Sequence, residues 1–162
     1  MEEFQEYIEK AQRNIEVAEH VLRVSYPTLQ DPKILLAACE NIFLAFSNAM
    51  SASVSYERRF KRIPPYAENF AGKLESFSKR IVPRYNVPRE TIVSLEELRD
   101  LLIKHEMSPV EFRKKESLVI CDDAYQYETL TAERLEIYLT QAQQFYERMH
   151  QLVARHANLF KR

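Results

Sequence analysis

Apolar residues in the first part of the chain recur at alternating intervals of three and four positions. The positions concerned are Phe4, Ile8, Ala11, Ile15, Ala18 and Leu22. This spacing puts the apolar side chains on one face of an α-helix and the polar ones on the other. Because proline disfavours the helical conformation in the residue before it, the pattern predicts an amphipathic helix over residues 2–25 that stops before Pro27.

A second and longer helix is predicted from about residue 31 to the residues before Pro64. Asp31 followed by Pro32 is typical of a helix N-terminus, with the aspartate as N-cap and the proline at the first helical position. The buried face of this helix carries small side chains, which allow a neighbouring helix to approach closely. These side chains are Ala38, Ala45, Ala49 and Ala52.

The remaining chain predicts four more helices. A third helix fits residues 66–82, where aromatic and aliphatic residues share one face. Serine followed three positions later by glutamate is a capping box, which marks a helix N-terminus. The two such pairs are Ser94 with Glu97 and Ser108 with Glu111. They predict helices over about 94–106 and 109–122, and Thr131 begins a last helix that continues to the C-terminus.

Glycine is nearly absent, since Gly72 is the one glycine among 162 residues. Glycine is the usual residue at positive φ, in hairpin turns and in phosphate-binding loops. Its scarcity therefore disfavours β-structure and glycine-dependent nucleotide sites. The length and the 46% of hydrophobic residues suit one domain with a substantial core. We expect residues 1–162 to form one all-α domain, an up-and-down bundle of about five to six helices.

The sequence points to a cytoplasmic protein without membrane association. The longest uncharged stretch, Asn41 to Tyr56, is short and polar compared with the roughly 20 apolar residues of a membrane span. The acidic N-terminus lacks the pattern of a secretory signal. Cys39 and Cys121 both fall in apolar patterns read as helical, and two cysteines are too few for a disulfide framework. We expect reduced thiols, with Cys39 buried and unreactive.

The sequence predicts neither a metal site nor a cofactor. Glu147 and His150 have the Glu-x-x-His spacing of di-iron bundles. Such bundles need this pair on two helices and a glutamate on each of two others. One pair alone is typical of a structural ion pair or a solvated helix face.

Charge is distributed unevenly, although the net charge is −1. Residues 58–89 hold nine bases against two acids, whereas the segments on both sides are acidic. Aromatic residues lie between these bases, and the combination is typical of surfaces that bind RNA or single strands. The candidate contacts are Arg58, Arg59, Lys61, Arg62, Lys79 and Arg80. An ordinary charged helix face explains the same pattern, so both interpretations stand.

One pair of residues suggests catalysis. Arg99 and His105 lie six positions apart in a predicted helix, about 120° apart around its axis, where they can border one cleft. Metal-independent RNA cleavage needs a group that transfers protons and a cation that stabilises the phosphorane-like transition state, and histidine and arginine serve these roles. A surface arginine and a histidine near a helix C-terminus explain the same pair without catalysis.

The helical pattern, the segment from Leu36 to Phe46 (LAACENIFLAF) and the Arg99–Asp100–(x)₄–His105 motif together resemble the HEPN family. HEPN domains are helical bundles that commonly dimerise and bind RNA. The resemblance implies an RNA-associated module, including the metal-independent endoribonucleases and toxin-type or defence components of the family. It assigns the catalytic motif to Arg99 and His105, with Asp100 as the supporting polar residue. It also implies a two-fold symmetric homodimer.

A second function fits the sequence equally well. The alanines of the second helix and the apolar stripe of the last helix are typical of contacts between helices. They would serve a non-catalytic protein-interaction or homodimerisation module, in which the same helical surface of each subunit meets the other.

Overall fold

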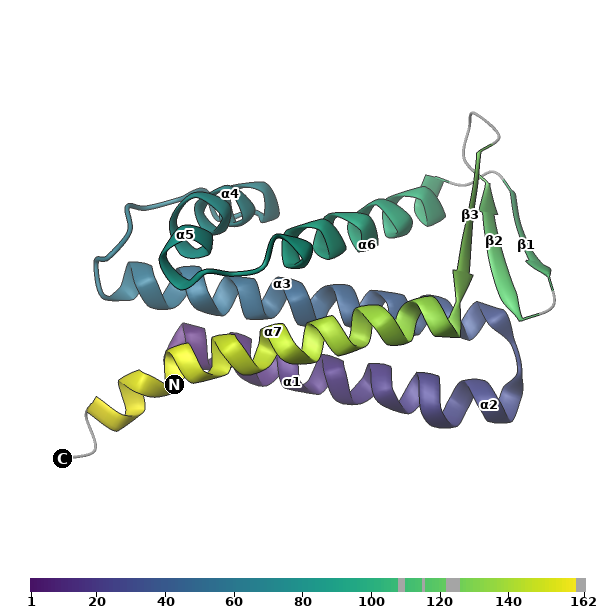
Figure 1. The fold of residues 1–162 in the computed structure, drawn as a ribbon, viewed down its shortest axis with the longest axis horizontal. Coiled ribbons are helices and arrows are strands. Elements are labelled where there is room, and N and C mark those ends of the chain that lie inside the picture. Colours follow the sequence, from purple (N-terminus) through teal and green to yellow (C-terminus); the bar gives the residue numbers. More distant parts are fainter. Residues whose placement is uncertain (108–109, 115, 122–125, 160–162) are drawn as a thin grey trace.

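The computed structural model describes residues 1–107, 110–114, 116–121 and 126–159, and these are mostly helical (Figure 1). Four long helices lie along one direction: α1 (Glu3–His20), α3 (Leu35–Arg59), α6 (Arg89–Met107) and α7 (Ala132–Leu159). Short helices complete the fold: α2 (Tyr26–Leu29), α4 (Phe70–Ser76) and α5 (Val82–Tyr85). A small sheet of β1 (Val110–Lys114), β2 (Ser117–Cys121) and β3 (Tyr127–Thr131) stands at one end, between α6 and α7.

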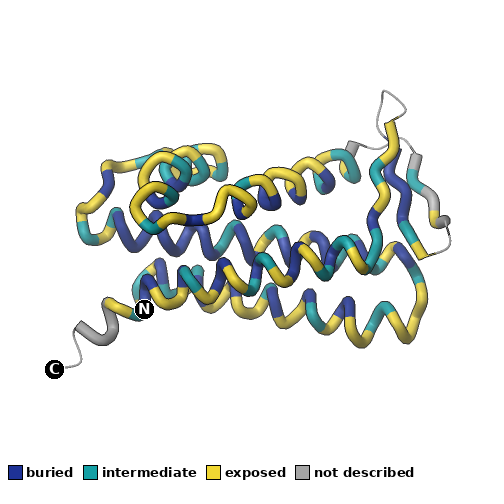
Figure 2. The backbone as a smooth tube through the Cα atoms, in the orientation of Figure 1, coloured by how far each residue is buried: buried dark blue, intermediate teal, exposed yellow. Residues whose placement is uncertain are grey.

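Helix α3 is the centre of the core and packs against α1, α7, α6 and α4. Its alanines at 38, 45, 49 and 52 are at most 1% exposed, so the predicted close approach of a neighbouring helix occurs within the chain. All residues from Met50 to Glu57 are buried, as the dark trace of α3 in Figure 2 shows. The alanine face is therefore not available for the homodimer contact expected from the sequence.

Asparagines set the register between α1 and α3. The Asn48 side-chain amide donates to the Asn14 Oδ1 at 2.8 Å, and the Asn14 amide donates to the Asn41 Oδ1 at 3.3 Å. A shift of α1 by one turn along α3 would leave these half-buried amides without hydrogen-bond partners. The free-energy cost of this shift is higher than that of the same shift between apolar faces.

The prolines expected to end the first and third helices lie inside continuous helical segments. Residues Val21–Ser25 and Phe77–Ile81 form π-helical turns directly before α2 and α5, which contain Pro27 and Pro83. The wider turn accommodates the proline ring and its missing N–H donor. The predicted ends before these prolines are wrong for this reason. The third helix also begins at Phe70, where the Asn69 side chain accepts the Gly72 N–H, rather than at residue 66.

Other residues take the conformational role that glycine usually has. Gln30, Lys61 and Asn86 adopt positive φ of 52–57°, and Gln30 and Asn86 end α2 and α5 in left-handed C-caps. Gly72 has no positive φ. It is needed because an added Cβ would lie 2.3 Å from the Ala67 carbonyl oxygen.

The sheet is the main departure from the predicted all-α fold. The expected helix over 109–122 is wrong, because β1, β2 and β3 pair antiparallel in chain order, with the backbone of Phe112 opposite that of Val119. The run Leu118 to Cys121 is buried and has the β-branched Val119 and Ile120 at its centre, which favours a strand. Cys121 therefore lies in a strand. Ser108 lies outside the described residues, and Glu111, its predicted capping partner, lies in β1.

Three other predictions concern helix starts. Asp31 is an N-cap as expected, accepting the Lys33 N–H at 3.1 Å, and the Thr131 hydroxyl accepts the Arg134 N–H at the start of α7. The capping box at Ser94 is wrong, because α6 begins at Arg89. Ser94 is buried within α6, and its hydroxyl bonds to Gln141 of α7.

Cys39 is fully buried in α3, as expected, and burial raises the pKa of its thiol to about 12. Its thiol is therefore in the protonated form at neutral pH. Among the described residues, the helix Pro32–Arg59 has the length and apolar composition that a membrane span requires. Half of its most apolar window is buried in the fold, and core helices of soluble proteins meet the same criteria of length and composition.

Candidate functional site

A groove between α3 and α6 holds both residues of the sequence-predicted catalytic pair. It consists of two adjoining hollows of about 370 and 390 Å³ that share Phe43, Leu102 and Glu106. His105 lines the first hollow and Arg99 lines the second. The first hollow also contains Glu40 and Leu44, and the second Ser47, Phe70 and Ile103. We call these two hollows the α3–α6 groove.

His105 is held by a carboxylate from the sheet. Its Nδ1 contacts the Glu111 Oε1, and the two side chains are 31% and 22% exposed. The contact joins the last turn of α6 to β1, and it leaves the Nε2 atom for another partner. A carboxylate bound to one imidazole nitrogen fixes the ring orientation and tautomer, which is how histidines that transfer protons are commonly held. The sequence pattern assigned Glu111 to a helix cap and so missed this contact.

Arg99 is exposed on α6, and its side chain lies against α4. The centre of its guanidinium is 4.7 Å from the ring centroid of Phe70, a cation–π contact that orients the planar group. Asp100 is also exposed on α6, but it lines neither hollow. The structure therefore brings Arg99 and His105 to one groove and leaves Asp100 outside it.

The groove combines an apolar floor with charges of both signs. Phe43 and Phe70 lie with ring centroids 5.6 Å apart. Leu44 and Ile103 are 44% and 39% exposed beside them. The acids Glu40 and Glu106 lie on the same groove as Arg99. This arrangement can stack a flat ring or accept an apolar side chain, and it offers both an anionic and a cationic contact to a polar ligand.

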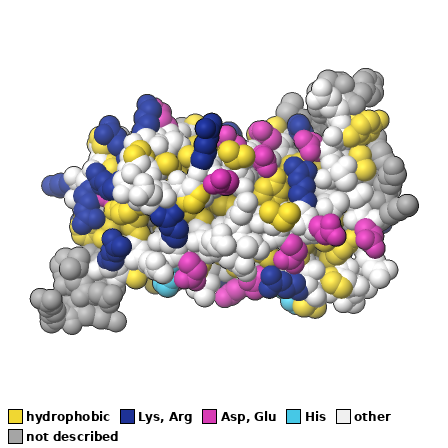
Figure 3. All heavy atoms as spheres, viewed as in Figure 1, with side chains coloured by type: hydrophobic (Ala, Val, Ile, Leu, Met, Phe, Trp, Pro, Cys, Tyr) yellow, Lys and Arg dark blue, Asp and Glu magenta, His cyan; other side chains and the backbone are white. Residues whose placement is uncertain are grey.

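The six candidate RNA contacts gather at one end of the fold. Figure 3 shows Lys and Arg concentrated over α4, α5 and the end of α3. Four of the six are held by carboxylates. The pairs are Arg58 with Glu68 and Glu3, Arg59 with Glu2, Arg62 with Glu57, and Lys79 with Glu75. Arg80 and Lys61 are exposed at the same end. With Arg84, seven bases thus face five ion-paired acids, a net charge of +2. We call this surface the basic end.

Glu57 organises the basic end and was not singled out from the sequence. Its carboxylate is fully buried, accepts the Arg84 Nη1–H at 2.9 Å and accepts the Tyr85 hydroxyl. Arg62 lies 3.8 Å away. Burial raises the pKa of Tyr85, and the hydrogen bond to Glu57 raises it further. The available signal was a charged residue on the buried face of a helix, which is rare unless the charge is paired.

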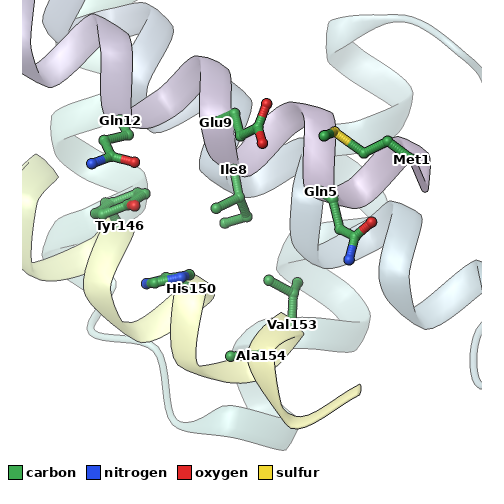
Figure 4. Close-up of a pocket in the computed structure, with 9 residues that line it drawn as sticks. All are labelled: Met1, Gln5, Ile8, Glu9, Gln12, Tyr146, His150, Val153 and Ala154. Carbon is green, nitrogen blue, oxygen red and sulfur yellow. The ribbon is translucent and has the colours of Figure 1, made fainter. Parts of the chain in front are cut away.

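A third hollow, of about 400 Å³, lies between α1 and α7 (Figure 4). Tyr146 and His150 stack there with ring centroids 5.5 Å apart, across from Gln5 and Gln12 of α1. Glu147, the partner of His150 in the Glu-x-x-His spacing, does not line this hollow. Within the described part of the chain, no group of three or more His, Cys, Asp or Glu side chains is placed to hold a metal ion.

Comparison with family models, curated proteins and solved structures finds no significant match to this chain.

Proposed function

We propose that this protein is an HEPN-like RNA-associated module that cleaves single-stranded RNA without a metal ion, using the α3–α6 groove. The observation that carries the proposal is the His105–Glu111 contact in a groove that continues to Arg99. In this proposal α1, α3, α6 and α7 form the up-and-down bundle of such domains.

The chemistry assigns one role to each group. His105 Nε2 takes the proton from a ribose 2′-hydroxyl, and the oxygen attacks the adjacent phosphorus. The bond to the 5′-oxygen of the next nucleotide breaks, that oxygen takes a proton from a solvent water, and the hydroxide left behind removes the proton that His105 received. The products are a 2′,3′-cyclic phosphate and a 5′-hydroxyl. Arg99 stabilises the negative charge on the phosphorane-like transition state, and Glu111 keeps the His105 ring oriented.

The basic end supplies the second part of the proposal, a contact for the RNA backbone. Guanidinium groups there lie over aromatic rings, with Arg58 4.4 Å from the Tyr66 centroid and Arg62 5.5 Å from that of Tyr56. Backbone binding of this kind releases counterions and therefore weakens as salt rises.

RNA affinity is expected to fall linearly with salt concentration on a logarithmic plot and to depend on the basic end. Reversing Arg59 and Arg80 to glutamate is expected to weaken binding about tenfold or more for every RNA sequence and to flatten the salt slope. Arg62 is left unchanged because its reversal would place an acid beside the buried Glu57. Fluorescence anisotropy with a labelled single strand measures both quantities.

The matched control is the double reversal of Arg23 and Arg113, each an exposed, ion-paired arginine remote from the basic end. Arg23 pairs with Glu136, and Arg113 pairs with Asp31. Equal loss in the control and the test variant, or affinity that ignores salt, would rule out the basic end as an RNA-binding surface.

A homodimerisation module is the second candidate, and the charges of α6 favour it. Arg99 and Glu106 lie seven residues apart, which puts them on one face of the helix, and both line the hollow that contains Ile103. When two copies of α6 pack antiparallel about a two-fold axis near Leu102 and Ile103, Arg99 of each faces Glu106 of the other. The pairing would bury the exposed Leu44 and Ile103.

Light scattering coupled to size exclusion tests this candidate. We expect Ile103→Asp to raise the dimer dissociation constant at least tenfold, because it buries a charge in the apolar contact. Val93→Asp is the control, since Val93 lies on α6 with similar exposure, 43% against 39%, and lines neither hollow. Arg99→Glu should weaken the dimer, and adding Glu106→Arg should restore it. A monomer at high micromolar concentration in the wild type excludes the candidate.

A further inference from the structure

We propose that the α3–α6 groove binds an unpaired guanine base, stacked on Phe43 and read by the carboxylate of Glu106. The inference rests on the proposed function for its ligand class, single-stranded RNA, and adds the identity of the base. Phe43 and Glu106 both line both hollows, so a base at this position lies next to the hollow of Arg99 and the hollow of His105.

Phe43 has the environment of a stacking platform. Its ring is half-buried in α3, and the Phe70 ring packs at 5.6 Å and 44° against it. The fold thus supports the ring, and Phe43 also lines both hollows of the groove. Unpaired bases are commonly bound by stacking on such aromatic side chains, which every base can do. Stacking on Phe43 therefore contributes affinity without choosing a base.

Glu106 supplies the selectivity for guanine over the other bases. It is exposed on α6 at the junction of the two hollows. An ionised carboxylate only accepts hydrogen bonds, through two oxygens side by side. Guanine presents two neighbouring donors, N1–H and the N2 amino group, which match these oxygens. Adenine and cytosine place an acceptor nitrogen beside their amino group, and uracil flanks its N3–H with two carbonyl oxygens. Each of these three would bring a lone pair against the carboxylate.

The placement also explains an acid in a groove that is proposed to handle a phosphodiester. A carboxylate directed at the base edge leaves the phosphate to Arg99. Arg99 and His105 are separated by a rise of about 9 Å along α6, and in this proposal the phosphodiester lies between them, with the base to one side on Phe43 and Glu106. Recognition of the base would then hold its own ribose and phosphate in one register relative to His105.

Binding to non-cleavable strands tests the inference separately from cleavage. The probes are 2′-O-methyl pentanucleotides of sequence UUNUU, with N as G, A, C or U. Their binding is measured by fluorescence anisotropy. We expect the G probe to bind roughly tenfold or more tightly than the other three, the discrimination typical of a bidentate contact. Inosine, which lacks the N2 amino group, is expected to lie between G and A.

Glu106→Gln is expected to reduce the preference for G to within about threefold, because the amide offers one acceptor and one donor. Glu96→Gln, an exposed glutamate of the same helix outside the groove, is the control and should keep it. Phe43→Ala should weaken all four probes, and Phe43→Leu provides the same test with the apolar volume retained if the alanine variant unfolds. Equal affinity for the four probes, or an unchanged preference in Glu106→Gln, overturns the inference.

The two proposals fail in different ways. A preference for G that depends on Glu106, together with intact RNA after long incubation, supports the base site and contradicts the nuclease. Cleavage that depends on His105 without any base preference supports the nuclease and contradicts the base site.

Discussion

Replacing His105 by alanine is expected to reduce RNA cleavage by a hundredfold or more while leaving the protein folded. The imidazole is the group that transfers the proton in the proposed reaction, and general acid–base catalysis commonly contributes ~10²–10⁴-fold. The His105 side chain is 31% exposed in the last turn of α6, so its truncation leaves no large cavity. Cleavage is measured on single-stranded RNA with a chelator present, because the reaction needs no metal ion.

Two further variants separate the roles of the groove. Arg99→Ala is expected to lower the cleavage rate by a similar factor, because it removes the positive charge that stabilises the transition state. Glu111→Gln is expected to lower the cleavage rate by less. The amide oxygen still accepts a hydrogen bond from the His105 Nδ1–H, although this contact is weaker than that of the carboxylate. Wild-type products should carry a 2′,3′-cyclic phosphate.

His150→Ala is the matched control for these variants. His150 is an exposed histidine of α7 in the hollow between α1 and α7, and it makes no contribution to the α3–α6 groove. The control should cleave at the wild-type rate. Equal activity in the wild type and all variants would point to a contaminating nuclease, and no activity in any of them would favour the homodimerisation module.

Replacing Glu57 by glutamine is expected to destabilise the fold by about 2–4 kcal/mol. The carboxylate is fully buried and accepts from both Arg84 and Tyr85. An amide keeps the volume, but its NH₂ group would face one of these donors, and the charge that pairs with Arg84 and Arg62 is lost. In a chain of this size the change corresponds to a fall in melting temperature of roughly 5–15 °C.

Urea unfolding followed by circular dichroism measures this loss. Glu75→Gln is the control, because Glu75 pairs with Lys79 on an exposed helix face, where ion pairs contribute little. We expect the control to unfold at the wild-type urea concentration. A Glu57→Gln variant as stable as the wild type would show that α5 is held to α3 by apolar packing alone.

The long helices and the N-cap at Asp31 could be predicted from the sequence because their signals are local. The spacing of apolar residues and an N-cap involve residues within a few helical turns, so both can be recognised in the sequence of a single helix. The sheet could not be predicted from the glycine count, because residues 115–116 and 122–126, which separate its strands in the sequence, contain no glycine. Buried β-branched residues at Val119 and Ile120 carried the signal, but so short an apolar run fits a helix as well.

The sequence by itself determined the candidate pair, Arg99 and His105, and the basic segment, because both are defined by residue type and spacing. The tertiary structure alone decided what surrounds them. Glu111 of β1 contacts His105 of α6, and Phe43 lines the groove from α3. Glu57 meets Arg84 across 27 residues of chain. Such contacts depend on how helices pack against one another. The sequence of a helix specifies which of its faces is buried, but it does not specify which other element packs on that face.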